Sequence, residues 1–219
     1  PQLLAIKQKR STEDKENKQQ GEQSPFFLGL KMKITKTPMF EVPLYHIKID
    51  NWKEKKELLL KLFSTVEHNV TKVEYYGGGS MHTDFGKTTN LSEIELYNNN
   101  ILNILKNEIE LFIYENNLKY NKNHTAYQFT NCWFEKGNLE DYHPVHNHGA
   151  YGYSVVCFIN YDPKVHKPTK FQSPFLDFDT GNIINYFPPN IEEGSMIIFP
   201  AAIAHSTVPS HVNVNRLIL

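Results

Sequence analysis

Three histidines in the second half of the chain have the residue type and spacing of a metal site. His146 and His148 are separated by one residue, and His205 follows the later apolar run MIIFP. On an extended segment, residues i and i+2 point to the same face, so both imidazoles can reach one ion. Imidazole suits Fe, Zn, Cu or Ni, and three protein ligands leave coordination positions open for catalysis. We therefore predict a catalytic metal site at these three histidines.

Arg216 is a second candidate, because arginine is scarce in this chain. Of the 23 basic residues, only Arg10 and Arg216 are arginine. The residues between His205 and Arg216 are enough for a strand, a turn and a returning strand. We therefore expect Arg216 beside the metal on the neighbouring strand. A buried guanidinium is costly unless it meets an anion, and its fork pairs with a carboxylate through two hydrogen bonds. This position predicts an anion-binding arginine.

Three other motifs are weaker. Gly86-Lys87-Thr88 ends like a phosphate-binding loop, but Met81 stands where the earlier glycine is needed. His146-Asn147-His148 spells the name of the HNH nucleases, yet the charge is balanced and no ligand-bearing helix is expected after it. His82-Thr83-Asp84 has the H-x-D spacing of an iron site, but we expect it in a glycine-rich connection between helices. We interpret all three as structural.

Two helices and a series of short strands must position these side chains. Apolar residues at helical spacing predict helices from Asn51 to Val70 and from Asn90 to about Asn117, and Asn90 and Glu93 resemble a capping box. A short strand is expected within residues 32–43. Further strands are predicted near Ala126–Phe134, Tyr153–Asn160, Ile183–Phe187, Ser195–Phe199, Ala204–Val208 and Val212–Leu219.

This order of elements predicts an α+β fold whose strands form a sandwich or a barrel-like roll. Residues 161–189 form a long connection rich in proline and aromatic residues, which we expect to be part of a substrate wall. Residues 1–25 are almost entirely polar and are predicted to be a disordered tail, followed by one domain over residues 26–219.

Composition excludes several classes of protein. The chain has 219 residues, 40% of them hydrophobic, with 23 basic and 24 acidic residues. This balance argues against a nucleic-acid binder, and no apolar run is long enough to span a membrane. The chain lacks the pattern of a signal peptide, and two cysteines fit a reducing compartment, so we expect a cytoplasmic protein, in the host cytoplasm if it is viral.

Three segments together resemble the 2-oxoglutarate- and Fe(II)-dependent dioxygenase superfamily, especially its prolyl-hydroxylase-like branch with small phage and bacterial relatives. They are NCWFEKGNLEDYHPVHNH, YSVVCFINYDP and EEGSMIIFPAAIAHSTVPSHVNVNR. The resemblance implies a double-stranded β-helix (jelly roll) with N-terminal helices packed on one side and Fe(II) at one mouth. It implies His146 and His205 as iron ligands, Arg216 as the partner of the far carboxylate of 2-oxoglutarate, and Trp133 and Ser154 near this cosubstrate.

The resemblance also implies an activity. Such enzymes use O2 to decarboxylate 2-oxoglutarate to succinate and usually hydroxylate a second substrate, in some cases with ascorbate as an accessory reductant. The substrate class that the branch favours is a protein or peptide side chain such as proline. No nucleic-acid or membrane partner is expected, and the resemblance leaves the substrate's identity and the oligomeric state open.

Two positions depart from the pattern of the superfamily. Its second ligand is usually Asp or Glu, and His148 stands in that place, with Asp141 and Asp84 the nearest carboxylates in sequence that could replace it. Phe158 stands where many prolyl hydroxylases have a tyrosine that assists the arginine, so Ser154 or another residue must supply that hydroxyl. A cupin-type metal enzyme, although the usual cupin glutamate is missing after the histidine pair, and a non-catalytic jelly-roll binding module therefore remain alternatives.

Overall fold

The larger of two sheets is antiparallel and has seven strands in the order β1-β8-β5-β10-β4-β3-β2. The long central strands β5 and β8 pair from Tyr153 opposite Pro200 to Cys157 opposite Met196, and β10 joins β5 to β4. The strands are β1 (Tyr45–Lys48), β2 (Thr71–Glu74), β3 (Ser80–Thr83), β4 (Glu135–Gly137), β5 (Tyr153–Asn160), β8 (Ser195–Pro200) and β10 (Arg216–Ile218).

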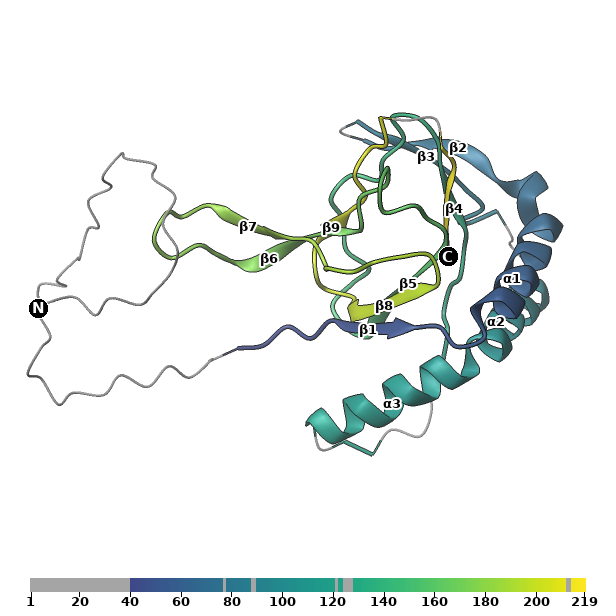
Figure 1. Ribbon diagram of the computed structural model, residues 1–219, viewed down its shortest axis with the longest axis horizontal. Coiled ribbons are helices and arrows are strands. Elements are labelled where there is room, and N and C mark those ends of the chain that lie inside the picture. The colour runs from purple at the N-terminus through teal and green to yellow at the C-terminus, as the bar shows by residue number, and fades with distance from the viewer. Residues whose placement is uncertain (1–39, 77, 88–89, 121, 124–127, 212–213) are drawn as a thin grey trace, which may run out of the picture. The chain divides into compact units, whose positions relative to one another are not determined.

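A second antiparallel sheet has the order β7-β6-β9, formed by β6 (Lys170–Leu176), β7 (Ile183–Tyr186) and β9 (His205–Ser206). The hairpin of β6 and β7 extends away from the seven-stranded sheet, and all four residues of β7 are exposed (Figure 1). On the other edge of β9, His205 forms an isolated antiparallel bridge with His146. The second sheet therefore brings the two histidine-bearing segments together.

The structure is a computed structural model that describes residues 40–76, 78–87, 90–120, 122–123, 128–211 and 214–219. The chain divides into two units, Pro1–Phe40 and Glu41–Leu219, and all the described helices and strands belong to the second. The predicted polar tail over residues 1–25 and its boundary with the domain lie outside the described residues. So do residues 32–39 of the first expected strand, and β1 begins only at Tyr45.

Three α-helices and one 3-10 turn complete the unit: α1 (Trp52–Val66), η2 (Glu67–Asn69), α2 (Leu91–Ile104) and α3 (Lys106–Tyr120). The expected N-cap is confirmed, because the Asn90 side chain accepts a hydrogen bond from the Ser92 amide at 3.0 Å. The prediction of one continuous helix after Asn90 is wrong. The backbone at Leu105 has φ −102° and ψ 17°, which separates α2 from α3.

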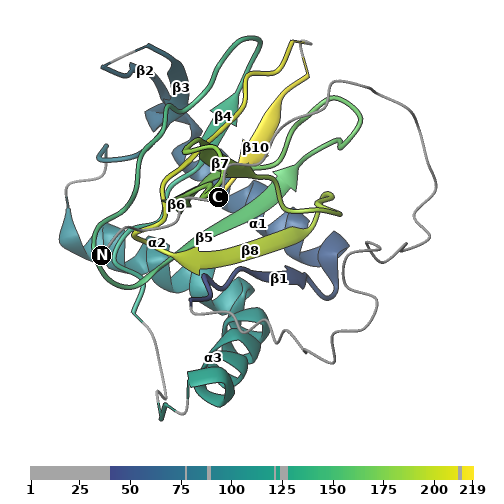
Figure 2. The same ribbon diagram turned by 90° about the vertical axis from the view of Figure 1, so that its left-hand side faces the viewer.

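The strands β5 and β8 bury both of their faces, and alternate residues divide them between two cores. Helices α1 to α3 pack on one face, as Figure 2 shows behind β5 and β8, through Cys157, Ile159, Met196 and Ile198. On the opposite face, Phe158, Ile197, Phe199 and Ile218 form a second core with Phe171 of β6. This second core is the interior of a roll closed by the smaller sheet. The predicted α+β jelly roll with helices on one side is confirmed.

Three expectations about single elements need correction. Residues 128–134 are not in a strand, since the Phe134 amide donates to the Asp84 carboxylate at 2.7 Å instead of joining a ladder, and β4 begins at Glu135. The expected connection after α1 contains the hairpin of β2 and β3, so His82 and Thr83 lie on a strand. The long connection over residues 161–189 contains β6 as well as the expected β7. Within the described residues, no helix combines the length and apolar character that a membrane span requires.

Candidate metal and cosubstrate site

The three predicted histidines come together at one end of the roll. One ring nitrogen of each of His146, His148 and His205 lies within 4.8 Å of the others. The centroid of the His146 ring lies 4.3 Å from that of His205, and the His148 ring lies 5.0 Å from each of the other two. Three imidazoles at these separations can point their nitrogens at a common point, which is the arrangement of a metal site with open positions.

Backbone pairing sets the positions of two of these rings. The amides of His146 and His205 each donate to the other residue's carbonyl oxygen at 2.9 Å. His146 Nδ1 lies 2.8 Å from the Pro144 carbonyl oxygen, and His205 Nδ1 lies 2.9 Å from that of Ile203. When Nδ1 carries the proton and donates to a carbonyl, Nε2 keeps its lone pair for a metal. The local backbone therefore selects the tautomer that can bind an ion.

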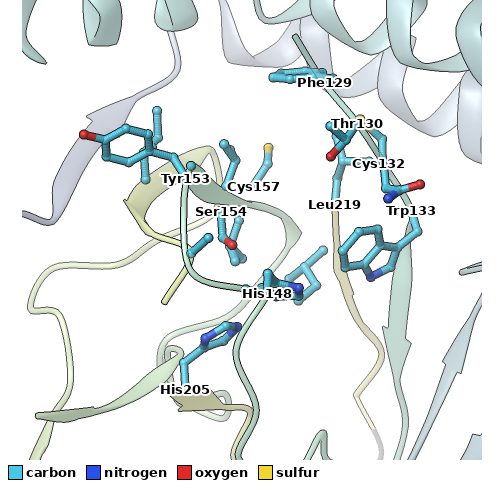
Figure 3. A pocket seen from close by; sticks show the side chains of 18 of the residues that line it. Phe129, Thr130, Cys132, Trp133, His148, Tyr153, Ser154, Cys157, His205 and Leu219 are labelled. Atoms are coloured by element: carbon cyan, nitrogen blue, oxygen red, sulfur yellow. The ribbon is translucent and has the colours of Figure 1, made fainter. Parts of the chain in front are cut away.

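His148 is held differently. Its side chain is exposed, and its amide donates to the Ala201 carbonyl at 2.9 Å, next to the strand β8. The indole of Trp133 lies 5.6 Å from the His148 ring, and Figure 3 shows the two approaching across the cavity with His205 nearby. The third ring of the triad thus lies at the mouth of the site, against an aromatic wall.

Burial keeps the triad neutral. Loss of solvation lowers the pKa of His205 to about 4, and the neighbouring histidines act in the same direction. Burial also lowers the pKa values of His146 and His148, while Glu135 opposes this shift in both. At neutral pH, all three rings are therefore in the form that ligates metals.

The two carboxylates that could have replaced His148 as a metal ligand are hydrogen-bonded to residues outside the triad. Asp141 accepts hydrogen bonds from Ser80 at 2.9 Å and from the Asn138 amide at 3.0 Å, and it pairs with His82 at 3.1 Å. Asp84 accepts from the Phe134 amide and from the hydroxyl of Tyr97. Among the described residues, the one group of side chains close enough to hold an ion contains histidines alone.

Arg216 is buried inside the roll on β10, directly opposite Gly137 of β4. No residue within the described part of the chain accepts a hydrogen bond from its Nε, which is fully enclosed. Burial lowers the pKa of the guanidinium, and the nearby Glu135 carboxylate counteracts this effect. Arg216 does not itself line the cavity, whereas Glu135 and Ile218, on the adjoining stretch of β4 and β10, do. The arginine is therefore a buried cation that has an enclosed donor without a partner.

A cavity of about 770 Å³ adjoins the triad. Trp133 and Ser154 line it, as Figure 3 shows, from the segment before β4 and from β5 respectively. Its far side reaches the helices through an apolar lining that includes Phe85, Leu105, Ile109, Phe112 and Phe129. The three histidines, Trp133 and Ser154 thus surround one space, with the histidines at one end and apolar side chains at the other, while Arg216 lies outside its lining.

Two neighbours of the triad did not stand out in the sequence. His143 stacks on His146, with ring centroids 3.7 Å apart and planes 14° apart, and its Nδ1 lies 3.1 Å from Glu135 Oε1. Glu135 also accepts a hydrogen bond from the Trp133 indole at 3.2 Å. The spacing H-x-x-H-x-H could have drawn attention to His143. Glu135, a single acid on a three-residue strand, offered no comparable signal.

Comparison with known proteins shows which solved structures have a similar fold. No family model and no curated protein matches the chain. Among solved structures, the non-heme alpha ketoglutarate dependent epimerase SnoN from nogalamycin biosynthesis is similar, with a TM-score of 0.52 and 11% identity over 80% of this chain and 74% of that one. A Pseudomonas putida prolyl-4-hydroxylase also matches, with a TM-score of 0.46 and 11% identity over 80% of this chain and 89% of that one. So does a viral collagen prolyl hydroxylase from Paramecium Bursaria Chlorella virus-1, with a TM-score of 0.47 and 12% identity over 80% of this chain and 92% of that one. The chain therefore shares the jelly-roll fold of this alpha ketoglutarate dependent epimerase.

Proposed function

We propose that this protein is an Fe(II)- and 2-oxoglutarate-dependent oxygenase that hydroxylates an aliphatic carbon. The observation that carries the proposal is the pairing of two features inside one roll. Three neutral imidazoles converge, and a buried arginine has an enclosed donor that finds no partner in the described part of the chain. A metal chelated by a dicarboxylic keto acid would satisfy both features at once.

The donor set fits Fe(II). His146, His148 and His205 would hold the ion through nitrogen, which suits iron and leaves positions open for a chelating keto acid and O2. Bound there, iron and its cosubstrate would supply the activation of O2 and the oxidative decarboxylation of 2-oxoglutarate to succinate. The carbonyl partners of His146 and His205 keep the protons on Nδ1, so Nε2 stays unprotonated.

Arg216 would bind the far carboxylate of 2-oxoglutarate. A guanidinium inside the roll gains a strong, charge-assisted pair from such an anion and otherwise bears the cost of burial. Gly137 leaves room beside it, since a Cβ at that position would lie 3.4 Å from Arg216 Nη2. Ser154 and Trp133 line the cavity near the triad and would flank the cosubstrate, whose keto acid end would face the histidines.

The apolar side of the cavity supports an uncharged reacting group. Its lining between the triad and the helices offers aromatic and aliphatic surface, with few polar side chains. Such a lining excludes water from the reacting carbon and favours an aliphatic C–H group. A prolyl or similar side chain of a protein or peptide is the substrate we propose, with the small-molecule cosubstrate bound on the arginine side.

The test is an anaerobic titration with Fe(II) and then 2-oxoglutarate, followed by visible spectroscopy. The chelate should give a metal-to-ligand charge-transfer band that is absent in His205→Ala and weakened in Arg216→Ala. His82→Ala is the matched control, because His82 is a half-buried histidine on β3 that pairs with Asp141 and not with the triad.

Three outcomes separate the candidate functions. A band that depends on His205 and Arg216 supports the oxygenase. Iron binding without a band at millimolar 2-oxoglutarate contradicts it and favours a cupin-type enzyme. Failure to bind any metal contradicts both and leaves a binding module.

A further inference from the structure

Glu135 and His143 form a second layer behind one ligand of the triad. The His143 ring is placed between two others, stacking on His146 at 3.7 Å and on Tyr75 at 4.2 Å, with interplanar angles of 14° and 13°. Nδ1 of His143 is within hydrogen-bonding distance of Glu135 Oε1. The same oxygen also accepts a hydrogen bond from the indole N–H of Trp133. Glu135 Oε1 therefore links the stacked His143 ring to Trp133 in the cavity wall.

The backbone of His143 is fixed as well. Its amide donates to Thr207 Oγ1 at 2.6 Å, and the Thr207 amide donates to the His143 carbonyl at 3.1 Å. These bonds continue the pairing that joins His146 to His205, because Thr207 lies two residues beyond His205. The stacked ring is thus anchored by the same two chain segments that carry the ligands, and it limits rotation of the His146 ring.

Glu135 also meets a charge requirement. Three neutral imidazoles leave the two positive charges of a divalent ion uncompensated, whereas a ligand set with a carboxylate removes one of them. Among the described residues that line the cavity, Glu135 is the one with an acidic side chain. It is buried, with 7% of its surface exposed, so water screens its charge only weakly.

We propose that Glu135 and His143 are positioning residues of the metal site, with His143 fixing the ring plane of His146 and Glu135 holding His143 and supplying the negative charge that the triad lacks. This inference rests on the proposed function only in that the triad binds a divalent metal. Neither residue needs to touch the ion. Glu135 acts through the electrostatic field of its carboxylate and by holding His143, and His143 acts by stacking on His146.

The test is Co(II) affinity and the Co(II) d–d spectrum, measured anaerobically without any cosubstrate. Glu135→Gln keeps an oxygen for His143 and Trp133 but removes the charge. Its affinity for Co(II) should fall at least tenfold, because partners of metal ligands commonly contribute ten- to hundredfold. Asp141→Asn is the matched control, since Asp141 pairs with His82 at the same 3.1 Å without contacting the triad, and its Co(II) affinity should stay within twofold of wild type.

The stack is tested by His143→Ala and His143→Phe. The alanine variant should weaken Co(II) binding and shift the d–d bands, and the phenylalanine variant, which restores a flat ring against His146, should recover most of the shift. Equal affinities for Glu135→Gln and Asp141→Asn would overturn the role of the charge. Identical spectra for the two His143 variants would overturn the role of the stack. Failure of the wild type to bind Co(II) would instead contradict the proposed function.

Discussion

The two faces of the central sheet treat buried polar groups in opposite ways. On the helix side, Lys55 Nζ lies 2.7 and 2.8 Å from the two carboxylate oxygens of Glu108, and Asn116 Oδ1 accepts the hydroxyls of Tyr45 and Tyr153. On the inner side, the Arg216 guanidinium has an enclosed Nε that finds no partner among the described residues, and the three histidines turn one ring nitrogen each toward a common point. Among the described residues, the largely buried cation on the helix side, Lys55, has a bonded counter-ion, whereas Arg216 on the inner side forms no salt bridge.

This difference separates groups that stabilise the fold from groups that we propose bind a ligand. Buried donors and acceptors in native proteins are nearly always satisfied, so an unsatisfied charged group requires a specific explanation. Asn98 Oδ1, on α2, is also enclosed and has no partner within the described ranges. Asn98 is neutral, however, and its Nδ2 donates to the Phe129 carbonyl. The unpartnered charged group on the inner side is thus the one that we propose binds an anion.

His205→Ala should produce the largest effect on the inner face. Removing the most buried ligand of the triad is expected to lower the affinity for Fe(II) or Co(II) at least a hundredfold, because two imidazoles remain and one of them is exposed. The unfolding temperature of the metal-free protein should change little compared with that loss. Isothermal titration measures the affinity, and a loss of less than tenfold would contradict the assignment of His205 as a ligand.

Glu108→Ala should have the reverse effect on the helix face. It leaves Lys55 beside apolar residues without its carboxylate, which is expected to cost about 3 kcal/mol of unfolding free energy. Metal affinity should remain within twofold of wild type, since Glu108 lies on the other side of the sheet. Urea unfolding and isothermal titration on the same sample test both statements. A large loss of metal binding would contradict the inference that the two faces act separately on stability and on metal affinity.

Acid should destabilise the metal-free protein through the inner face. His205 has a folded-state pKa of about 4, whereas the unfolded chain takes up the proton near 6.5. The unfolded state therefore binds more protons between these values, and the unfolding free energy falls as pH drops from 6.5 to 4, by about 3 kcal/mol at most. Urea unfolding across this range should show a shallower fall in His205→Asn than in wild type.

Arg216→Lys should have the smallest effect of the series. Lysine keeps the charge but replaces the planar fork with a single ammonium, so the affinity for 2-oxoglutarate should fall about tenfold while metal affinity is retained. The charge-transfer titration at saturating Fe(II) measures this change. An unaltered affinity would indicate that the far carboxylate binds elsewhere.

The sequence predicted the elements whose local signals agree with their packing. Strand β5 begins and ends where its apolar run predicts, and Asn90 caps α2 as its position before Ser92 and Glu93 suggests. The break at Leu105 has no glycine or proline to mark it, so the local sequence carried no signal for the end of α2. The hairpin of β2 and β3 was missed because its strands have four residues each and flank a glycine-rich turn.

The candidate site was predictable to the extent that its residues carry rare chemistry. Histidines at i and i+2 and an unusual arginine stand out in any sequence of this composition. Glu135 does not, because one of 24 acidic residues acquires its role only when β4 pairs with β10 and the side chain is turned inward. The engagement of Asp84 and Asp141 by neighbouring donors likewise depends on contacts between distant segments.

The reciprocal amide bonds between His146 and His205 have a kinetic consequence. They form entirely from backbone groups, so holding His146 and His205 together does not require a metal ion. An incoming ion then has little chain to order, and preorganised sites bind with a reduced entropic penalty. Association should be governed by dehydration of the ion, and substitutions around the triad should appear mainly as faster metal release. Stopped-flow exchange with a chelator would therefore distinguish variants that equilibrium titration ranks alike.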